Sequence, residues 1–361
     1  MNMEKLRVAI VGCGGIANGK HMPSLQKVEE CEMVAFCDLD IERAQIAAAE
    51  YGIPGAKVTT DYMEIANDPD IDVVHVCTPN RSHSFITIAC LEGGKHVMCE
   101  KPMAKTAADA QAMLEAAKRT GKKLSIGYQY RQDYVHTTMK AACDRGDLGE
   151  IYFAKAHALR RRGVPTWGVF LNEYEQGGGP LIDIGTHALD LCLWMMNNYE
   201  PHSVMGSKYR KLADTAYASN GWGSWDPKDY TVEDSCFGFI KMKNGASIML
   251  ESSWAINITD AVEGTITLAG TKGGATSRGG LQFNGEEDGK LYSQNTPRGG
   301  EVEYFDGYNP GDRCESDARQ WIRSIINNTD PCVLPEQALV VSKILEAIYK
   351  SSETGETIYF D

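Results

Sequence analysis

The chain has 361 residues, of which 43% are apolar and 24% are charged, and its formal net charge at pH 7 is −13. A chain of this length exceeds one ordinary hydrophobic core, so we expect a soluble protein with two domains. The negative charge would repel a phosphate backbone, and no apolar run approaches the ~18 residues of a membrane span, so we expect neither nucleic acid nor membranes as partners.

The start of the chain and its cysteines predict a cytoplasmic location. The N-terminus passes directly from charged residues into a predicted strand, whereas a signal peptide needs a longer apolar stretch and a cleavage site. The eleven cysteines are scattered without any C-x-x-C spacing, which is typical of buried thiols in a reducing compartment. His96, Cys99 and His187 lack metal-ligand spacing, so no metal is expected.

The first 127 residues alternate between apolar strands and helices. Strands are predicted at residues 7–11, 32–37, 73–77, 96–99 and 123–126, and helices at 16–28, 41–51, 84–91 and 107–120. This alternation predicts a parallel sheet with right-handed crossovers, and the near-continuous apolar strands indicate that both of its faces are covered. We therefore predict an α/β fold with a Rossmann dinucleotide-binding domain over residues 1–127.

The turn after the first predicted strand fits two phosphate-binding patterns. From Gly12 it approaches the dinucleotide pattern G-x-G-x-x-G, with Ala17 in place of the third glycine. From Gly14 it approaches the P-loop pattern G-x-x-x-x-G-K-[ST], with His21 in place of the hydroxyl residue. A glycine turn without any ligand is a third alternative.

Residues around the turn favour the dinucleotide pattern. Asp38 ends the second strand, where an acidic side chain can bind the ribose hydroxyls. His21 offers no hydroxyl for magnesium, and Pro23 would interrupt a P-loop helix. The Asp38 carboxylate would also repel a 2′-phosphate. No arginine fork follows it, although Arg43 is near enough to swing in, so we expect NAD rather than NADP.

After residue 127 the pattern becomes that of an antiparallel sheet. Strands are predicted at 151–161, 235–242, 246–254 and 264–269, and the final helices at 314–327 and 336–351. Asn244-Gly245 lies between two of these strands as a hairpin turn that needs a positive φ. These features predict an α+β domain over residues 128–361 with a large, mostly antiparallel open sheet, which would bind substrate and oligomerise.

One segment between these strands carries candidate chemistry. Pro180 is placed as a first helical residue, so Asp183 and His187, four residues apart, would face the same way. Gly185 weakens a helix unless another group approaches its backbone closely. Asp190 would lie within reach of the other ring nitrogen of His187. The pair is either a structural helix salt bridge or a catalytic pair, with the histidine as proton acceptor.

The chain resembles the Gfo/Idh/MocA oxidoreductases, which include glucose–fructose oxidoreductase and inositol dehydrogenase. The resemblance covers essentially the whole chain. Its motifs, in the family's order and spacing, are GCGGIA, Asp38, Thr78-Pro79-Asn80, Glu100-Lys101-Pro102 and GGGPLIDIGTHALD. The Glu-Lys-Pro triplet together with the D-x-x-x-H helix is the specific part. Alanine at position 17 is common in the family.

The resemblance implies a role for each matched residue. His187 would remove a hydroxyl proton while a hydride leaves the same carbon for the nicotinamide, and Lys101, on a Lys-Pro bond that the family often holds in cis, would stabilise the negative charge on that oxygen. Asp183 would orient the substrate or the histidine. For Lys101 the alternative is a solvated loop lysine. The implied cofactor residues are Gly12, Gly14, Gly15, Ile16, Asp38, Thr78, Asn80, His83, Glu100 and Lys101.

Aromatic and arginine side chains favour a sugar as substrate, because ring faces stack on pyranoses and guanidinium groups bind hydroxyls. The tryptophans and tyrosines of segment 217–230 belong to this group, or else to a subunit interface or local packing. In a strand, only part of the trio Arg160 to Arg162 can reach a cleft. The candidate substrate residues are Tyr130, Arg131, Arg162, Trp167, Asp183 and His187.

The stretches RRRGVPTWG and WDPKDYTVED resemble the branch of the family that oxidises glucosides and related sugars, often at the C3 hydroxyl. The resemblance thus implies an NAD-dependent dehydrogenase that forms a 3-keto glucoside, assembled as a homo-oligomer (dimer, tetramer or hexamer). Three alternatives stay open: an inositol 2-dehydrogenase, an NAD-dependent glycosidase that works through a 3-keto intermediate, and a non-catalytic NAD-binding sensor.

Overall fold

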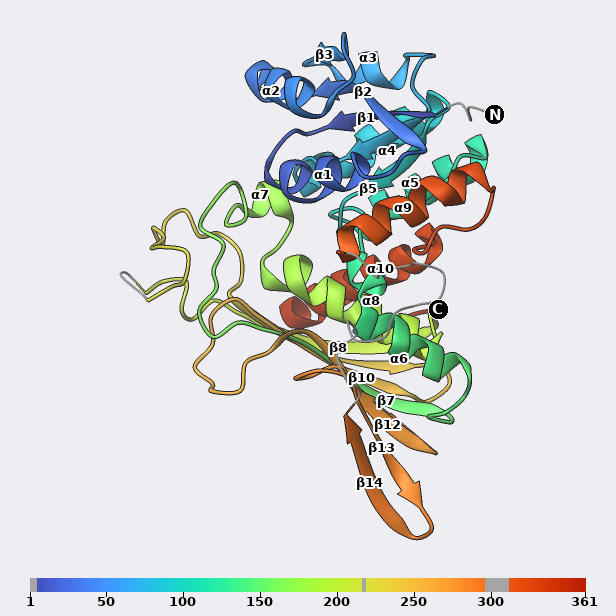
Figure 1. Ribbon diagram of the computed structural model, residues 1–361. Helices are drawn as coiled ribbons and strands as arrows, with labels where there is room; N and C mark the ends of the chain where they lie inside the picture. The colour runs from blue at the N-terminus through green and yellow to red at the C-terminus, as the bar shows by residue number, and fades with distance from the viewer. Residues whose placement is uncertain (1–4, 216–218, 296–311) are drawn as a thin grey trace. The chain divides into compact units, whose positions relative to one another are not determined.

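The computed structural model describes residues 5–215, 219–295 and 312–361 (Figure 1). They form two compact units, the first made of residues 5–132 and 312–339 and the second of the remainder. This division differs from the predicted domains 1–127 and 128–361 in two ways. The boundary lies a few residues later, and a segment near the C-terminus returns to the first unit.

The first unit contains a parallel sheet with the strand order β3-β2-β1-β4-β5-β6 in its described residues. This is the doubly wound order of a Rossmann domain, so the predicted α/β fold is confirmed. All residues of β4 are buried, which fits a sheet covered on both faces. The strands are β1 (Leu6–Val11), β2 (Cys31–Cys37), β3 (Lys57–Thr59), β4 (Val73–Val76), β5 (His96–Cys99) and β6 (Leu124–Ile126).

The helices of the first unit begin and end close to their predicted bounds, and α2 and α5 match them. The helix expected at 16–28 is shorter, because it starts as a π-helical turn and its α-helical part ends at Leu25. The elements are η1 (Ala17–His21), α1 (Met22–Leu25), α2 (Ile41–Tyr51), α3 (Tyr62–Ala66), η2 (Asn80–Ser82), α4 (His83–Glu92), α5 (Ala107–Thr120), η3 (Gln129–Gln132) and α9 (Arg313–Ile326).

Helix α9 joins the first unit although it lies near the end of the chain. Its Trp321 and Ile322 are fully buried in the core cluster that α1, α2 and β1 also line. The side chain of Asp312 caps the helix by accepting a hydrogen bond from the Cys314 N–H. Residues 312–339 therefore supply part of the nucleotide-type core.

The second unit contains a sheet with the strand order β14-β13-β12-β11-β7-β10-β9-β8-β15 over its described residues. Only β7 and β10 pair in parallel, so the mostly antiparallel sheet is confirmed, and Gly245 has the φ of 91° that the hairpin prediction required. Helix α8 packs on β7 and β11, and α6 packs on α8. Strands β8 and β12 to β15, and helix α6, were not predicted.

The strands of this unit are β7 (Ile151–Leu159), β8 (Pro201–Tyr209), β9 (Ser235–Met242), β10 (Ser247–Ser253), β11 (Glu263–Gly270), β12 (Gly273–Thr276), β13 (Gln282–Glu287), β14 (Lys290–Asn295) and β15 (Ile358–Tyr359). Its helices are α6 (Tyr134–Asp144), α7 (Glu173–Gln176), η4 (Leu181–Gly185), α8 (Thr186–Met196) and most of α10 (Pro335–Thr354). No helix in the described ranges is long and apolar enough to cross a membrane.

The eleven cysteines all lie in described residues and are free thiols. Eight of them are buried, as their places in apolar segments indicated.

Candidate active site

The turn after β1 has the form of a phosphate cradle. Gly12 has a φ of +93°, and a Cβ there would lie 2.7 Å from the carbonyl carbon of Cys77, so only glycine fits. A Cβ on Gly14 or Gly15 would meet nothing within 4 Å, which leaves their backbone open to a ligand. The Asn18 side chain donates to the Cys13 and Gly14 carbonyls at 2.8 and 2.9 Å and holds the turn in shape.

Asp38 lies beside this turn at the end of β2, as predicted. Its carboxylate accepts hydrogen bonds from the Cys13 N–H at 2.8 Å and the Asp40 N–H at 2.9 Å, and the side chain remains partly exposed. Arg43 forms an ion pair with Asp40, with 3.3 Å between Nε and Oδ2. Ala17, in place of the third glycine, is fully buried where helix and sheet pack closely.

The P-loop alternative fails at Lys20. In a P-loop this lysine reaches the bound phosphates. Here it is only 4% exposed, and its Nζ lies 2.9 Å from Glu100 Oε1, inside the protein. The turn is therefore of the dinucleotide type.

His83 connects two loops at this edge of the sheet. Its ring nitrogens lie 2.8 Å from the carbonyl oxygens of Thr78 and Pro102. Burial lowers the pKa of His83, so the neutral ring has one N–H and donates to one of these carbonyls at a time. With 1% of its surface exposed, His83 shapes the loops and offers little surface to a cofactor, whereas Asn80 and Thr78 are partly exposed.

Glu100 and Lys101 follow β5 directly, and the Lys101–Pro102 bond is cis, as the resemblance implied. The Glu100 carboxylate is buried; Oε1 lies 2.8 Å from His21 Nε2, and Oε2 accepts the Lys101 N–H at 3.1 Å. Burial alone would raise the pKa of Glu100, but Lys20 and His21 keep it well below its usual range. Glu100 thus contacts the backbone of Lys101.

In the second unit, the predicted D-x-x-x-H helix starts after Pro180, whose φ of −59° is helical. A π-helical turn, η4, leads into α8, so the helix is not α-helical from its first residue. A Cβ on Gly185 would lie 3.0 Å from Ser252 Oγ and 3.1 Å from Ser252 Cβ. Strand β10 thus approaches the backbone at Gly185 closely, which accounts for a glycine inside this helix.

Asp183 is fixed by two side chains from outside its helix. Its Oδ2 accepts the indole N–H of Trp254 at 3.0 Å and lies 3.8 Å from Arg160 Nη1. His187 and Asp190 are both buried, at 6% and 1% exposure. The catalytic role of Asp183 and His187 stays a prediction at this stage.

Two exposed tryptophans, Trp167 and Trp222, form an aromatic group that Arg160 links to Asp183. The rings of Trp167 and Trp222 meet edge to face at 4.9 Å and are 51% and 46% exposed. The Arg160 guanidinium lies 5.1 Å from the Trp222 ring centroid and pairs with Glu263 through Nε and Nη2 at 2.5 and 2.7 Å. Arg160, which was not among the predicted site residues, therefore joins the exposed indoles to Asp183.

Arg162 is held away from this group. Its guanidinium donates to the carbonyl oxygen of Ile256 at 3.2 Å and to Asn257 Oδ1 at 2.6 Å. The aromatic segment predicted at 217–230 divides, because Trp225 and Tyr230 are buried in local packing while Trp222 is exposed. Residue 217 lies outside the described residues.

Tyr130 and Arg131 do not fit their predicted substrate role. Arg131 is 1% exposed, and its Nη1 donates to the Cys332 carbonyl at 2.9 Å and to Gln337 Oε1 at 2.7 Å. The guanidinium of Arg313 covers the Tyr130 ring at 4.4 Å. Both side chains are engaged by residues 312–339, whose return to this unit was not predicted.

Comparisons with known proteins follow the same division of the chain. Residues 6–128 match the family described as "Oxidoreductase family, NAD-binding Rossmann fold", and residues 136–276 match "GFO/IDH/MocA C-terminal domain". The chain is 36% identical over 365 residues to D-glucoside 3-dehydrogenase from Escherichia coli (strain K12), with 99% of this chain and 98% of that protein covered. The chain belongs to the Gfo/Idh/MocA oxidoreductase family.

The chain is also similar to two other proteins. It is 34% identical over 212 residues to inositol 2-dehydrogenase from Salmonella typhimurium, with 58% of this chain and 60% of that protein covered. The crystal structure of aldose-aldose oxidoreductase from Caulobacter crescentus complexed with glycerol has a TM-score of 0.80 at 26% identity and covers 99% of this chain and 100% of that one. The predicted family resemblance is confirmed.

The turn of this oxidoreductase fits a nicotinamide dinucleotide. The open backbone at Gly14 and Gly15 precedes the first helix, where pyrophosphate binds in Rossmann domains, and Asp38 presents a carboxylate for ribose hydroxyls. In the parts of the chain that the structure describes, no His, Cys, Asp and Glu side chains form a group that could hold a metal ion.

Glu233 is a residue of the site region that the sequence analysis missed. Its buried carboxylate accepts the Gly179 and Leu181 N–H groups at 2.9 and 3.2 Å and the Tyr349 hydroxyl at 2.8 Å. These N–H groups precede or begin the helix of Asp183 and would otherwise lack partners. Glu233 lies about fifty residues further along the chain, so no local pattern reveals it.

Glu233 should make the stability of the protein depend on pH. Burial raises its pKa above the usual 4.5, so the folded state binds its proton more tightly than the unfolded state, and this contribution to stability is lost as pH rises through the raised pKa. We expect the free energy of unfolding of Glu233→Gln, relative to that of the wild type, to increase as pH rises from 4.5 to 7. The increase should be roughly 1.4 kcal/mol for each pKa unit by which folding raises the pKa of Glu233. Denaturant unfolding over this pH range measures it.

The exposed Glu287→Gln, in the same unit, is the control and should show no such gain. A Glu233→Gln difference that stays constant with pH would contradict the raised pKa.

Proposed function

We propose that this protein is an NAD-dependent dehydrogenase that oxidises a ring secondary hydroxyl of a glucoside, at C3. The observation that carries the proposal is the 36% identity to D-glucoside 3-dehydrogenase, which extends over 99% of this chain. The likeness to inositol 2-dehydrogenase covers only 58% of the chain. The match to D-glucoside 3-dehydrogenase extends over both units, which favours the glucoside.

The exposed aromatic group of the second unit supports a sugar substrate. Trp167 and Trp222 offer indole surfaces of the kind that stack on the apolar face of a pyranose ring. Arg160 lies over the Trp222 ring and reaches toward Asp183, whose carboxylate is an acceptor for hydroxyl groups. A substrate made of one sugar ring matches this combination of flat apolar and polar groups.

In the proposed mechanism, bound NAD supplies the acceptor for the hydride that leaves the substrate carbon. His187 accepts the hydroxyl proton, since a neutral imidazole is a good base near neutral pH. Lys101 provides a cation for the oxygen as it loses that proton. Asp183, held by Trp254, keeps the substrate hydroxyls or the histidine in one orientation. Proton and hydride leave together, so the products are a ketone, a proton and NADH.

The surroundings of Asp38 support NAD over NADP. Its carboxylate accepts only two backbone hydrogen bonds, so acceptor capacity remains for ribose hydroxyls. Arg43, the arginine closest in sequence, pairs with Asp40. A 2′-phosphate would therefore meet carboxylates without a guanidinium fork. The homo-oligomer and the cytoplasmic location that the sequence predicts stay predictions.

A substrate panel distinguishes the proposed function from its alternatives. With NAD and a set of glycosides, free sugars and inositols, we expect a glucoside to lose two hydrogen atoms while an equal amount of NADH forms. Nicotinamide absorbance and product mass are followed together, so that NADH that stays bound is still detected through the product. Preference for inositol, aglycone release without net NADH, or NAD binding without any product would each replace the proposal.

Removal of either proposed catalytic side chain should abolish turnover. We expect Lys101→Ala and His187→Ala each to lower kcat by at least about 100-fold, because each removes a group that acts only as the hydroxyl is oxidised. NAD affinity, measured by fluorescence titration, should stay within about threefold of the wild type. Lys118→Ala and His202→Ala, both exposed, are the matched controls. Near-normal turnover in either catalytic variant would contradict the assignment.

Asp38→Ala tests the choice of cofactor. The variant loses the ribose acceptor and the negative charge, so we expect NAD to bind about tenfold more weakly and the preference of NAD over NADP to shrink. The dissociation constants of both nucleotides give the ratio. An unchanged ratio would show that Asp38 is not the ribose ligand.

A further inference from the structure

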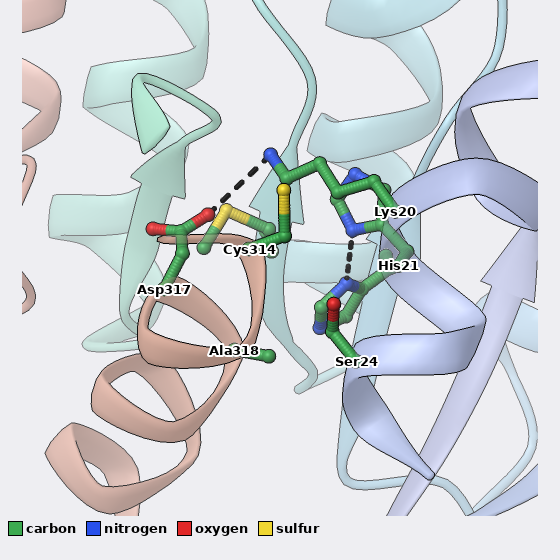
Figure 2. A pocket seen from close by; sticks show the side chains of 8 residues that line it. Lys20, His21, Ser24, Cys314, Asp317 and Ala318 are labelled. Carbon is green, nitrogen blue, oxygen red and sulfur yellow. Dashed lines mark hydrogen bonds and ion pairs between the residues drawn. The ribbon is translucent and has the colours of Figure 1, made fainter. Parts of the chain in front are cut away.

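Lys20 is a buried cation that neither the dinucleotide site nor the proposed mechanism uses. Its Nζ lies 2.9 Å from Glu100 Oε1, 3.4 Å from Asp317 Oδ2 and 3.4 Å from Gln129 Oε1. Burial opposes its charge, but Glu100 and Asp317 keep the pKa of Lys20 above its usual value. Figure 2 shows this side chain reaching from the first helix to Asp317 on α9.

The Glu100 carboxylate links this cation to the backbone of Lys101. Oε1 is close to Lys20 and His21, while Oε2 accepts the Lys101 N–H. On its other side the carboxylate rests against Gly127, where a Cβ would come within 2.9 Å of Oε1. The side chain is thus enclosed by polar partners and by backbone, so its position sets that of Lys101.

Two histidines extend the network in one direction. His21 Nε2 lies 2.8 Å from Glu100 and His21 Nδ1 lies 2.8 Å from His75 Nδ1. Burial lowers the pKa of both histidines, so both rings are neutral. A carboxylate only accepts hydrogen bonds, so the His21 proton is on Nε2, and His75 must donate through Nδ1 to the bare Nδ1 of His21.

This tautomer leaves His75 Nε2 as an acceptor. That atom is buried and has no hydrogen-bond partner among the described residues. It belongs to a ring that lines a cavity large enough for about one water molecule, together with Ser24 and Cys314. The two hydrogen bonds of the histidine pair therefore have one direction, from His75 to His21 and from His21 to Glu100.

We propose that Lys20 is a positioning residue for Lys101, which it holds through the carboxylate of Glu100. The proposal rests on the proposed function, because it assumes that Lys101 acts on the substrate. Lys20 lies in η1, directly after the dinucleotide turn, and Glu100 lies at the end of β5. One buried ion pair thus joins the element that starts the cofactor site to the loop that carries the proposed catalytic lysine.

Loss of Lys20 changes the protonation of Glu100. Lys20 is a main cause of the low pKa of Glu100, so its removal raises that pKa relative to the wild type and the carboxyl group binds a proton at a less acidic pH. A protonated carboxyl group holds the Lys101 N–H more weakly. The titratable groups that face Glu100 are Lys20, His21, His75, Cys77, His83, Cys99 and Asp317.

The test compares Lys20→Met with the wild type over a range of pH. We expect kcat to fall by about 100-fold, the loss typical of a small misplacement of a catalytic group, and the acid limb of the kcat profile to move to higher pH. NAD affinity should stay within about threefold. Lys27→Met is the matched control, because Lys27 also pairs with α9, through Glu315 at 3.3 Å, but its side chain is 59% exposed.

The double variant Lys20→Met/Glu100→Gln keeps the test valid if the single variant is unstable. It removes both charges of the Lys20–Glu100 pair and keeps Asp317, while the glutamine carbonyl can still accept the Lys101 N–H. We expect kcat to recover at least tenfold relative to Lys20→Met and the displaced acid limb to disappear. Loss of NAD affinity with normal kcat, or an unmoved acid limb, would overturn the proposal.

A stability measurement separates this proposal from the proposed function. Without substrate or cofactor, the destabilisation of Lys20→Met relative to the wild type should grow as pH rises from 4.5 to 7, because its raised Glu100 pKa favours the folded state only at low pH. Asp317 also loses Lys20 as a partner, so Glu100→Gln in the same background should reduce that growth without abolishing it. If the wild type oxidises no sugar but Glu100→Gln reduces the growth, the proposed function fails while the Lys20–Glu100 coupling stands; a growth that Glu100→Gln leaves unchanged overturns the coupling itself.

Discussion

The organisation of the first unit depends on the buried carboxylate of Glu100. A charge at this depth is stable only because Lys20 and His21 compensate the loss of water around it, and it can serve Lys101 only while they do. The same lysine contacts Asp317, so η1, the end of β5 and helix α9 meet at one ion-pair network. Replacement of Lys20 would deprive both Glu100 and Asp317 of their cation.

The second unit repeats this solution in a different form. Glu233 is also a buried carboxylate, and it accepts N–H groups at the start of the helix that carries Asp183 and His187. Both proposed catalytic elements are therefore held by acids that do not themselves react. Each of the two described π-helical turns, η1 and η4, lies next to one of these acids, and π-helical turns are frequent at functional sites.

Local patterns predicted much of this arrangement. Helix α5 and strand β5 have their predicted bounds because the apolar pattern of each element is flanked, within a few residues, by glycine or proline. The glycine turn and the place of Asp38 at the end of β2 follow from local chemistry in the same way. Strand β3 was missed because three residues carry too little pattern.

The expectations for Arg131 and for the arginines at 160 and 162 differ from the structure because of partners that are distant in sequence. Arg131 looks like a ligand-binding residue until Cys332 and Gln337 enclose it, and Arg160 is distinguished from Arg162 only by Glu263. The return of α9 to the first unit also has a consequence for biosynthesis. Trp321 and Ile322 are translated after residues 133–309 of the second unit, so the nucleotide-type core must wait with an open apolar face while that segment is made.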